Sequence, residues 1–142
     1  MSLTETMPSY QPLQPENDPT GRGQHEPGAK VDAGKTRLDL VLGAFANALM
    51  GVGEVGTFGA RKYTDDGWLS VPNGKARYSD ALLRHYFKEQ RGEIIDSDSR
   101  LHHDLHLAWN ALARVELRIR EEQEAMTALQ ASLPEPQPVP ST

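Results

Sequence analysis

The chain has 142 residues, no cysteine, 37% hydrophobic residues and a formal net charge of -5. The lack of cysteine excludes a disulfide framework and a thiolate zinc site, and the negative charge argues against nucleic acid as the main partner. No apolar run approaches the roughly 18 residues that span a bilayer, and the N-terminus lacks the basic and apolar regions of a secretory signal. We therefore expect a cytoplasmic protein without a membrane partner.

Proline-rich segments flank the chain. Residues 1–29 contain five prolines, and residues 134–142 read PEPQPVPST. Proline lacks an amide hydrogen and disfavours helix at the preceding residue, so we predict a flexible arm over 1–29 and a flexible tail over 134–142. The remaining domain, 30–133, is short for a self-sufficient core. This predicts a homodimer or homotetramer.

The domain opens with three cations, Lys30, Lys35 and Arg37, close to a flexible glycine. Lys35 and Arg37 follow Ala33-Gly34, and glycine lets a backbone approach a ligand closely. The segment fits an anion-binding site, and the alternative is a solvated loop.

Apolar residues then recur at helical spacing over Leu40–Tyr63, which predicts a helix. Residues 51–56, GVGEVG, match the dinucleotide-binding glycine fingerprint, but no β-strand pattern precedes them, so we reject that interpretation. Close packing against another helix is the preferred use of these glycines.

A turn with aromatic and basic residues follows the helix. Lys62, Tyr63 and Trp68 combine positive charge with aromatic rings, which suits the phosphates and base of a nucleotide. The alternative is an ordinary loop whose tryptophan anchors the core.

The next predicted helix begins with Ser79 as its N-cap, runs to about Arg91 and is ended by Gly92. It carries His85, and Arg84 is one of its cations.

An acidic connection leads into a long helix predicted over about Arg100–Leu133. Glu93, Asp96 and Asp98 offer carboxylate oxygens to a divalent cation, and the alternative is a solvated acidic turn. His103, His106 and Asn110 follow at i, i+3 and i+7, on one stripe of the helix. The distal part, residues 113–132, suggests a helical extension or a subunit contact.

Together these segments resemble the phage dATP/dGTP diphosphohydrolase family, the MazZ-type enzymes related to MazG-like nucleotide pyrophosphohydrolases. The resemblance covers about residues 30–112 and implies a small all-α, MazG-like helical bundle. The chain has Arg100 where the family often has glycine. The matching segments are KVDAGKTRLDLV (30–41), GARKY (59–63) with Trp68, Arg77-Tyr78, Arg84-His85, GEIIDSD (92–98) and HDLHLAWNA (103–111).

The resemblance implies hydrolysis of a purine deoxynucleoside triphosphate to the monophosphate and pyrophosphate, with Mg²⁺ or Mn²⁺ as cofactor. In phages such activity is associated with dGMP supply for modified DNA, and the enzyme would then act in the host cytoplasm. The candidate metal ligands are Glu93, Asp96, Asp98 and His103. The candidate catalytic residues are His85, His106 and Asn110. The candidate substrate-binding residues are Lys35, Arg37, Lys62, Tyr63, Trp68, Arg77, Tyr78 and Arg84.

Two alternatives remain open at this point. His103-Asp104 also fits the metal-binding pair of an HD-domain phosphohydrolase, although that fold needs further, well-separated ligands. A non-enzymatic helical interaction protein would use its tails and residues 113–132 as working surfaces.

Overall fold

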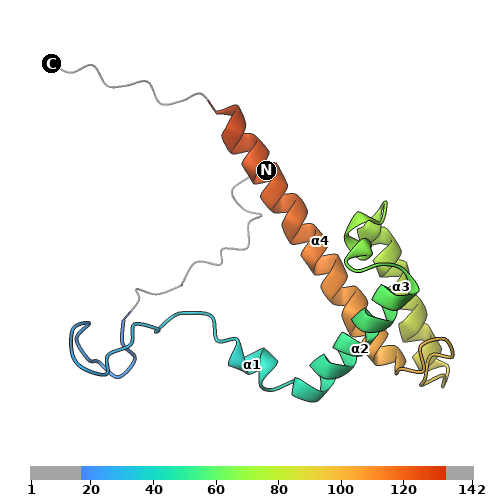
Figure 1. Cartoon of the computed structure of the whole chain (residues 1–142), viewed down its shortest axis with the longest axis horizontal. Coiled ribbons are helices and arrows are strands. Elements are labelled where there is room, and N and C mark those ends of the chain that lie inside the picture. Colours follow the sequence, from blue (N-terminus) through green and yellow to red (C-terminus); the bar gives the residue numbers. More distant parts are fainter. Residues whose placement is uncertain (1–16, 134–142) are drawn as a thin grey trace. The chain divides into compact units, whose positions relative to one another are not determined.

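The computed structural model describes residues 17–133, and these form an all-α structure (Figure 1). Its elements are α1 (Asp39–Leu42), α2 (Ala46–Lys62), the short 3-10 helix η2 (Gly67–Ser70), α3 (Gly74–Gln90) and α4 (His103–Ser132). The all-α prediction is thus confirmed for the described residues. Residues 1–16 of the predicted arm (1–29) and the predicted tail at 134–142 lie outside them. The chain divides into two compact units, Met1–Ala46 and Asn47–Thr142.

The first unit contains an irregular loop organised around Asp18. Its buried carboxylate accepts hydrogen bonds from the backbone N–H groups of Thr20 (2.6 Å) and Lys30 (2.7 Å) and from the Thr20 hydroxyl (2.5 Å). These bonds, the Thr20 hydroxyl first, lower the pKa of Asp18. The N–H of Ala33 donates to the carbonyl of Asn17 at 3.0 Å, so residues 17–33 form a closed loop before α1.

The helix predicted over Leu40–Tyr63 is interrupted at residues 43–45. The carbonyl of Asp39 accepts hydrogen bonds from both Gly43 (3.1 Å) and Ala44 (3.3 Å), so the regular helical ladder ends there. Glycine weakens a helix by up to about 1 kcal/mol relative to alanine. The prediction is therefore wrong at this break and right for α2.

The glycines of α2 admit side chains of α4 at close range. A Cβ at Gly51 would lie 2.7 Å from the Leu105 side chain, and one at Gly56 would lie 3.3 Å from Nε1 of Trp109. Any larger residue would push these side chains away. The interpretation of the glycines as a helix-packing device is confirmed at these two positions, whereas nothing lies within 4 Å of a Cβ at Gly53.

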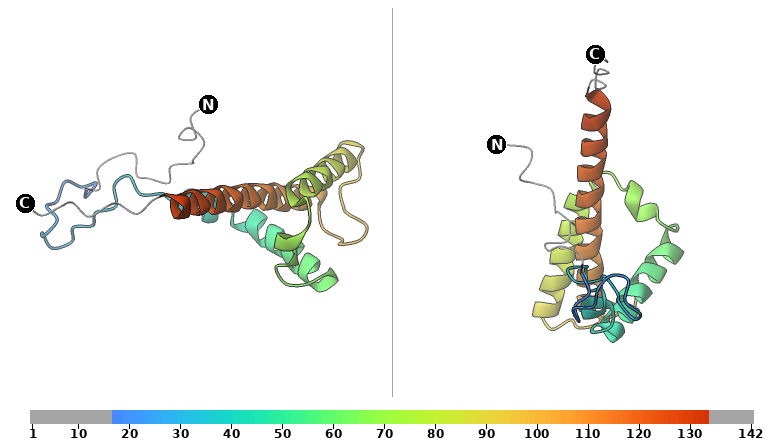
Figure 2. Two further views of the ribbon diagram at one scale, coloured as in Figure 1. Left: turned by 90° about the horizontal axis from the view of Figure 1, so that it is seen from above. Right: turned by 90° about the vertical axis from the view of Figure 1, so that its left-hand side faces the viewer.

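Helices α3 and α4 form the main packing pair of the second unit and run antiparallel (Figures 1 and 2). At one end, a Cβ on Gly74 would lie 2.8 Å from Leu117. At the other end, His85 contacts His103 near the start of α4. Figure 2 shows that α4 extends well past the end of this contact.

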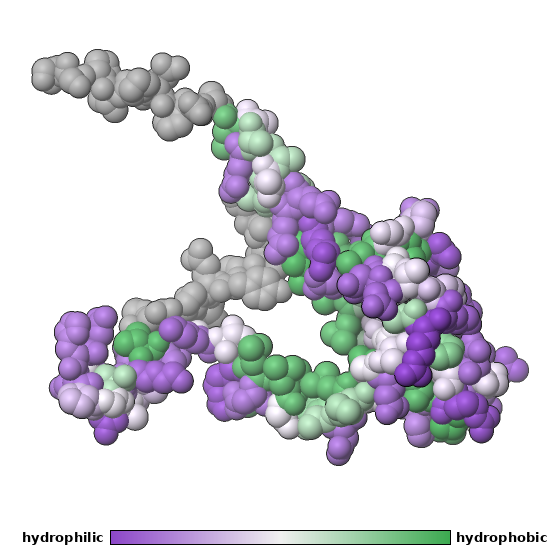
Figure 3. All heavy atoms as spheres, viewed as in Figure 1, coloured by the Kyte–Doolittle hydropathy of each residue, from purple (hydrophilic) through white to green (hydrophobic). Residues whose placement is uncertain are grey.

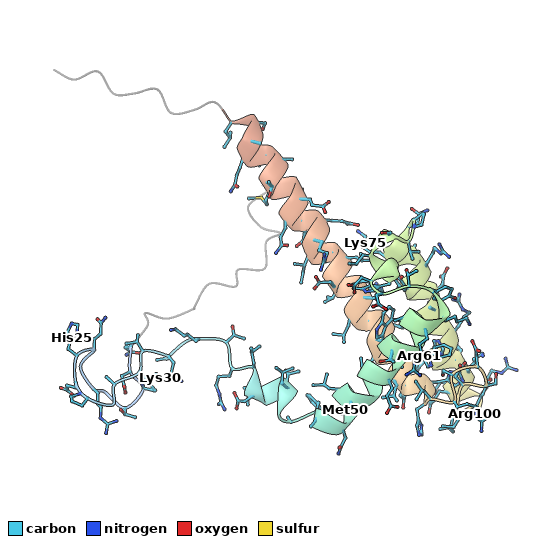
Figure 4. The ribbon with its side chains drawn as sticks, viewed as in Figure 1. His25, Lys30, Met50, Arg61, Lys75 and Arg100 are labelled. Carbon is cyan, nitrogen blue, oxygen red and sulfur yellow. The ribbon has the colours of Figure 1, made fainter. Side chains whose placement is uncertain are left out.

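Two helix starts differ from the sequence-based prediction. Ser79 is not an N-cap, because α3 already begins at Gly74 and the Ser79 hydroxyl donates to the carbonyl of Lys75 at 2.7 Å. Helix α4 begins at His103 rather than near Arg100, which has a left-handed φ of 64°. Figure 4 labels Lys75 at the start of α3 and Arg100 in the loop before α4.

The interior of the second unit is unusually polar. Val55 and Ala113 are its buried hydrophobic residues among those described, whereas buried polar side chains come from Asp96, His103, His106 and Asn110. Burying a polar group is costly unless it is hydrogen-bonded, so this cluster calls for an explanation. None of the helices within residues 17–133 has the length and apolar character of a membrane span.

Candidate metal centre

The loop between α3 and α4 folds back and brings its acidic residues to the start of α4. Gly92 has a φ of 90°, which reverses the chain at the end of α3. The N–H of Asp96 donates to the carbonyl of Leu101 at 2.8 Å, and the N–H of His103 donates to the carbonyl of Ile94 at 3.0 Å. These two backbone bonds fix the loop against the first turn of α4.

Three side chains from separate elements converge at this point. One potential ligand atom each from His85 on α3, Asp96 in the loop and His103 on α4 all lie within 4.8 Å of one another. The Nδ1 atoms of the two histidines are 2.7 Å apart. Two imidazole nitrogens and a carboxylate oxygen at this spacing form a donor set that suits a divalent metal ion.

The orientation of His103 is supported from its far side. This side chain is fully buried, and its Nε2 atom lies 3.3 Å from Oε1 of Glu93 without forming a hydrogen bond. Metal-ligating histidines commonly direct their second nitrogen towards a carboxylate, which fixes the tautomer. Glu93 therefore suits an orienting role, with Nδ1 of His103 left to bind a ligand.

Asp96 is held as a carboxylate by its neighbour Ser99. Burial alone would raise the pKa of Asp96, but hydrogen bonds to Oδ2 from the Ser99 N–H (2.9 Å) and hydroxyl (3.0 Å) outweigh it. The pKa of Asp96 is accordingly lowered. An ionised carboxylate is the form that binds a cation.

His106 joins the same hydrogen-bonded chain. Because the Ser99 hydroxyl donates its single hydrogen to Asp96, it accepts one from Nε2 of His106, 2.6 Å away. This assigns the Nε2–H tautomer to His106 and leaves its Nδ1 as an acceptor. Asn110 supports the turn below, since its Nδ2 donates to the carbonyl of His106 at 2.7 Å.

His85 and His106 are held in their neutral form. Burial, with the nearby His106 and His103, lowers the pKa of His85 to about 4, and burial also lowers the pKa of His106. The rings of these two residues stack with centroids 4.4 Å apart. Neutral imidazole is the metal-binding form, so the site is prepared for a cation at neutral pH.

The predicted metal ligands have different positions in this arrangement. Asp96 and His103 belong to the converging group, which His85 completes. Glu93 lies behind His103. Asp98 instead pairs with Nζ of Lys62 at 2.5 Å, and this hydrogen bond and charge raise the pKa of Lys62.

The predicted substrate-binding residues fall into separate groups. The rings of Trp68, Tyr78 and Trp109 form a cluster with centroids 5.7 to 6.4 Å apart, and the Tyr78 hydroxyl donates to the carbonyl of Trp68 at 3.0 Å. Tyr63 is 75% exposed, and Nζ of Lys62 lies 5.9 Å from the centre of its ring. Exposed Arg77 and Arg84 lie on α3, and Lys35 and Arg37 belong to the first unit.

Ser99 is the main residue that the sequence analysis missed. It connects Asp96 to His106, yet a serine in an acidic turn has no distinctive pattern of its own. The spacing Asp-x-x-Ser is a signal in hindsight, because an aspartate side chain often accepts hydrogen bonds from residues that follow it in a turn.

A family model described as dATP/dGTP diphosphohydrolase, N-terminal, matches residues 25–127. The chain belongs to this family. The match covers the whole converging group, all of α3 and α4 as far as Thr127. No curated protein and no solved structure matches the chain.

Proposed function

We propose that this protein is a metal-dependent enzyme that hydrolyses dATP and dGTP to the deoxynucleoside monophosphate and pyrophosphate. The observation that carries the proposal is the convergence of His85, Asp96 and His103 within 4.8 Å, in a chain of the dATP/dGTP diphosphohydrolase family. The neutral imidazole of His85 and the ionised carboxylate of Asp96 match the needs of a metal centre. Supply of dGMP to phage DNA synthesis is the role that the resemblance favours.

The donor set favours Mn²⁺ over Mg²⁺. Mg²⁺ prefers all-oxygen coordination, whereas imidazole nitrogen suits transition metals and Mn²⁺ accepts both. When bound, such an ion would polarise a phosphate oxygen and make a water molecule a better nucleophile. The ligands would be His85, Asp96 and His103.

The remaining polar residues of the site would assist in distinct ways. Nδ1 of His106 is an acceptor on a neutral ring and can take a proton from an attacking water as a general base. Ser99 holds Asp96 in place from one side, and Glu93 orients His103 from the other.

Cations around the centre would hold the triphosphate. Lys62 is tied to the acidic loop through Asp98, and Arg84 directly precedes His85 in α3. Charge-assisted hydrogen bonds from such groups neutralise phosphate oxygens. Tyr63 follows Lys62 in the sequence and is exposed. Its ring would contact the purine.

The test is product analysis with purified full-length protein, Mn²⁺ and each nucleoside triphosphate. We expect dGTP and dATP to yield monophosphate and pyrophosphate, and Asp96→Asn to lower the rate at least about 100-fold. His102→Ala, which alters an exposed neighbouring histidine, should retain the wild-type rate.

Release of inorganic triphosphate would instead assign HD-type chemistry. No turnover with any triphosphate, from folded protein supplied with Mn²⁺ and Mg²⁺, would favour the interaction-protein alternative.

A further inference from the structure

The distal part of α4 carries a regular stripe of apolar residues on one face. The spacing alternates between three and four residues, as in the a and d positions of a coiled coil. Six of the seven positions are apolar. We call this stripe the α4 seam, and it consists of Leu112, Val115, Ile119, Glu122, Met126, Leu129 and Leu133.

The α4 seam faces away from α3. The face of α4 that contacts α3 carries Leu117, next to Gly74, and Glu121, which forms an ion pair with Lys75. The seam residues lie on a different face of α4, where four are exposed and the other three are half-buried. The exposed fractions are 53% for Leu112, 53% for Val115, 44% for Leu129 and 63% for Leu133.

The same stripe is covered further upstream. Leu105 lies seven residues before Leu112, hence on the same face, and there it packs against α2 at Gly51. The stripe is therefore a packing surface that α2 covers at one end. Figure 3 shows hydrophobic surface interspersed with hydrophilic surface along α4.

We propose that the α4 seam binds the α4 seam of a second copy of this chain as an antiparallel two-helix coiled coil. From Leu112 to Leu133 the seam is about 32 Å long at 1.5 Å per residue. Helix α1 also exposes apolar side chains (Figure 3), but its four residues span only about 6 Å. A second copy of α4 is the element that matches the seam in length and spacing.

Glu122 determines the direction of the pair. A parallel, in-register pair would place Glu122 against Glu122, and facing like charges are unfavourable. In an antiparallel pair a positions face d positions. With Leu112 opposite Leu129 and Val115 opposite Met126, each Glu122 lies opposite Ile119.

The contact should be modest in strength. A two-helix seam of this length corresponds to the lower end of specific interfaces, roughly 1,200 Å² in total. Glu122 weakens it further because a polar group at a core position lowers stability while specifying the register. We therefore expect a dimer that forms in the micromolar range.

Cysteine cross-linking tests both the contact and its direction, because the chain has no cysteine of its own. Oxidation of full-length Val115→Cys/Met126→Cys protein should give covalent dimers, since these positions face each other across the pair. Val115→Cys/Ala128→Cys is the matched control, with its second cysteine off the seam, and should give no covalent dimers. Dimers from each single variant would show a parallel pair and overturn the proposal.

Light scattering over a range of concentrations provides the independent test. As the protein concentration rises, the wild type should change from monomer to dimer. Ile119→Asp should raise the concentration at the midpoint of this change at least about tenfold. Ala131→Asp, a charge on another face of the same helix, should leave it unchanged. A wild type that is monomeric at 200 µM (about the upper limit of a micromolar equilibrium) would overturn the proposal. The proposal would also be overturned if the dimer persisted in Ile119→Asp but was lost in Val41→Asp, which alters α1. These measurements do not depend on the proposed enzymatic activity.

Discussion

The two halves of α4 distribute polar and apolar residues in opposite ways. The first half buries the side chains of His103, His106 and Asn110, whereas the α4 seam, which begins at Leu112 and continues through the second half, is mostly exposed. Figure 2 shows both halves as one continuous helix, with α3 alongside the first. The usual rule of apolar inside and polar outside is thus reversed along a single element.

This reversal separates two tasks within one helix. Buried polar groups are tolerated where they are hydrogen-bonded, as His106 is by Ser99 and Asn110 is by a backbone carbonyl. Nε2 of His103 is the exception among the described residues, and it sits at the candidate metal centre. Exposed apolar stripes indicate an interaction surface. The comparison therefore supports our two proposals, chemistry in the first half and association in the second.

The largest expected effect comes from removing a metal ligand in the first half. His103→Ala should abolish tight Mn²⁺ binding and lower turnover at least about 100-fold, while the concentration dependence of light scattering stays as in the wild type. Isothermal titration with Mn²⁺ alone measures the binding. Ile119→Asp should have the opposite pattern of effects: the variant should no longer dimerise, but its Mn²⁺ affinity and its turnover per chain should match the wild type.

Circular dichroism of both variants provides the control for folding. If His103→Ala retained Mn²⁺ affinity within about threefold, the metal centre would not include this residue. If it dissociated the dimer, the two halves of α4 would not be separate in function.

A smaller effect is expected where α2 packs against the first half of α4. Gly51→Ala would introduce a Cβ 2.7 Å from Leu105, whereas Gly53→Ala meets nothing within 4 Å. Both variants gain helix propensity, but only the first must displace a packed side chain. We expect Gly51→Ala to unfold at a free energy about 1–2 kcal/mol lower than Gly53→Ala in urea titrations. Equal stabilities would mean that α2 does not pack closely on α4.

The smallest effect compares a polar contact beside the first half of α4 with an exposed ion pair further along the helix. Tyr78→Phe removes the hydroxyl that donates to the Trp68 carbonyl, in the ring cluster that includes Trp109 of α4, and should lower stability by about 1 kcal/mol. Arg120→Ala breaks the exposed pair with Glu116 (2.7 Å) and should cost about 0.3 kcal/mol. Thermal unfolding of both variants measures the difference, and a larger loss from Arg120→Ala would contradict the assignment of the second half as solvent-exposed.

The sequence predicted the all-α fold and the C-terminal end of α2, because apolar periodicity is a local property. It failed at residues 43–45, where the periodicity of Leu42, Phe45 and Leu49 continues across a break in the backbone. It also placed the start of α3 at Ser79, because a good cap residue was favoured over Gly74. Gly74 carries no distinctive sequence signal. It is suited to this position because a Cβ there would lie 2.8 Å from the Leu117 side chain.

The site was partly predictable for a similar reason. Asp96 and His103 were identified as candidate ligands, and His85 as a functional residue of another kind. Which carboxylate approaches the histidines depends on the backbone bonds that fold the loop back, from Asp96 to Leu101 and from His103 to Ile94. Spacing alone does not distinguish Asp96 from Asp98, which faces Lys62 instead.

The unbroken course of α4 has a kinetic consequence. In the antiparallel pair the twofold axis lies between residues 120 and 121, so each His103 is about 26 Å from it along the helix at 1.5 Å per residue. The two reaction centres would then stand about 50 Å apart, each built entirely from its own chain. Substrate saturation should accordingly be hyperbolic, with a Hill coefficient of about one, and mixed dimers of active and inactive chains should retain half of the activity.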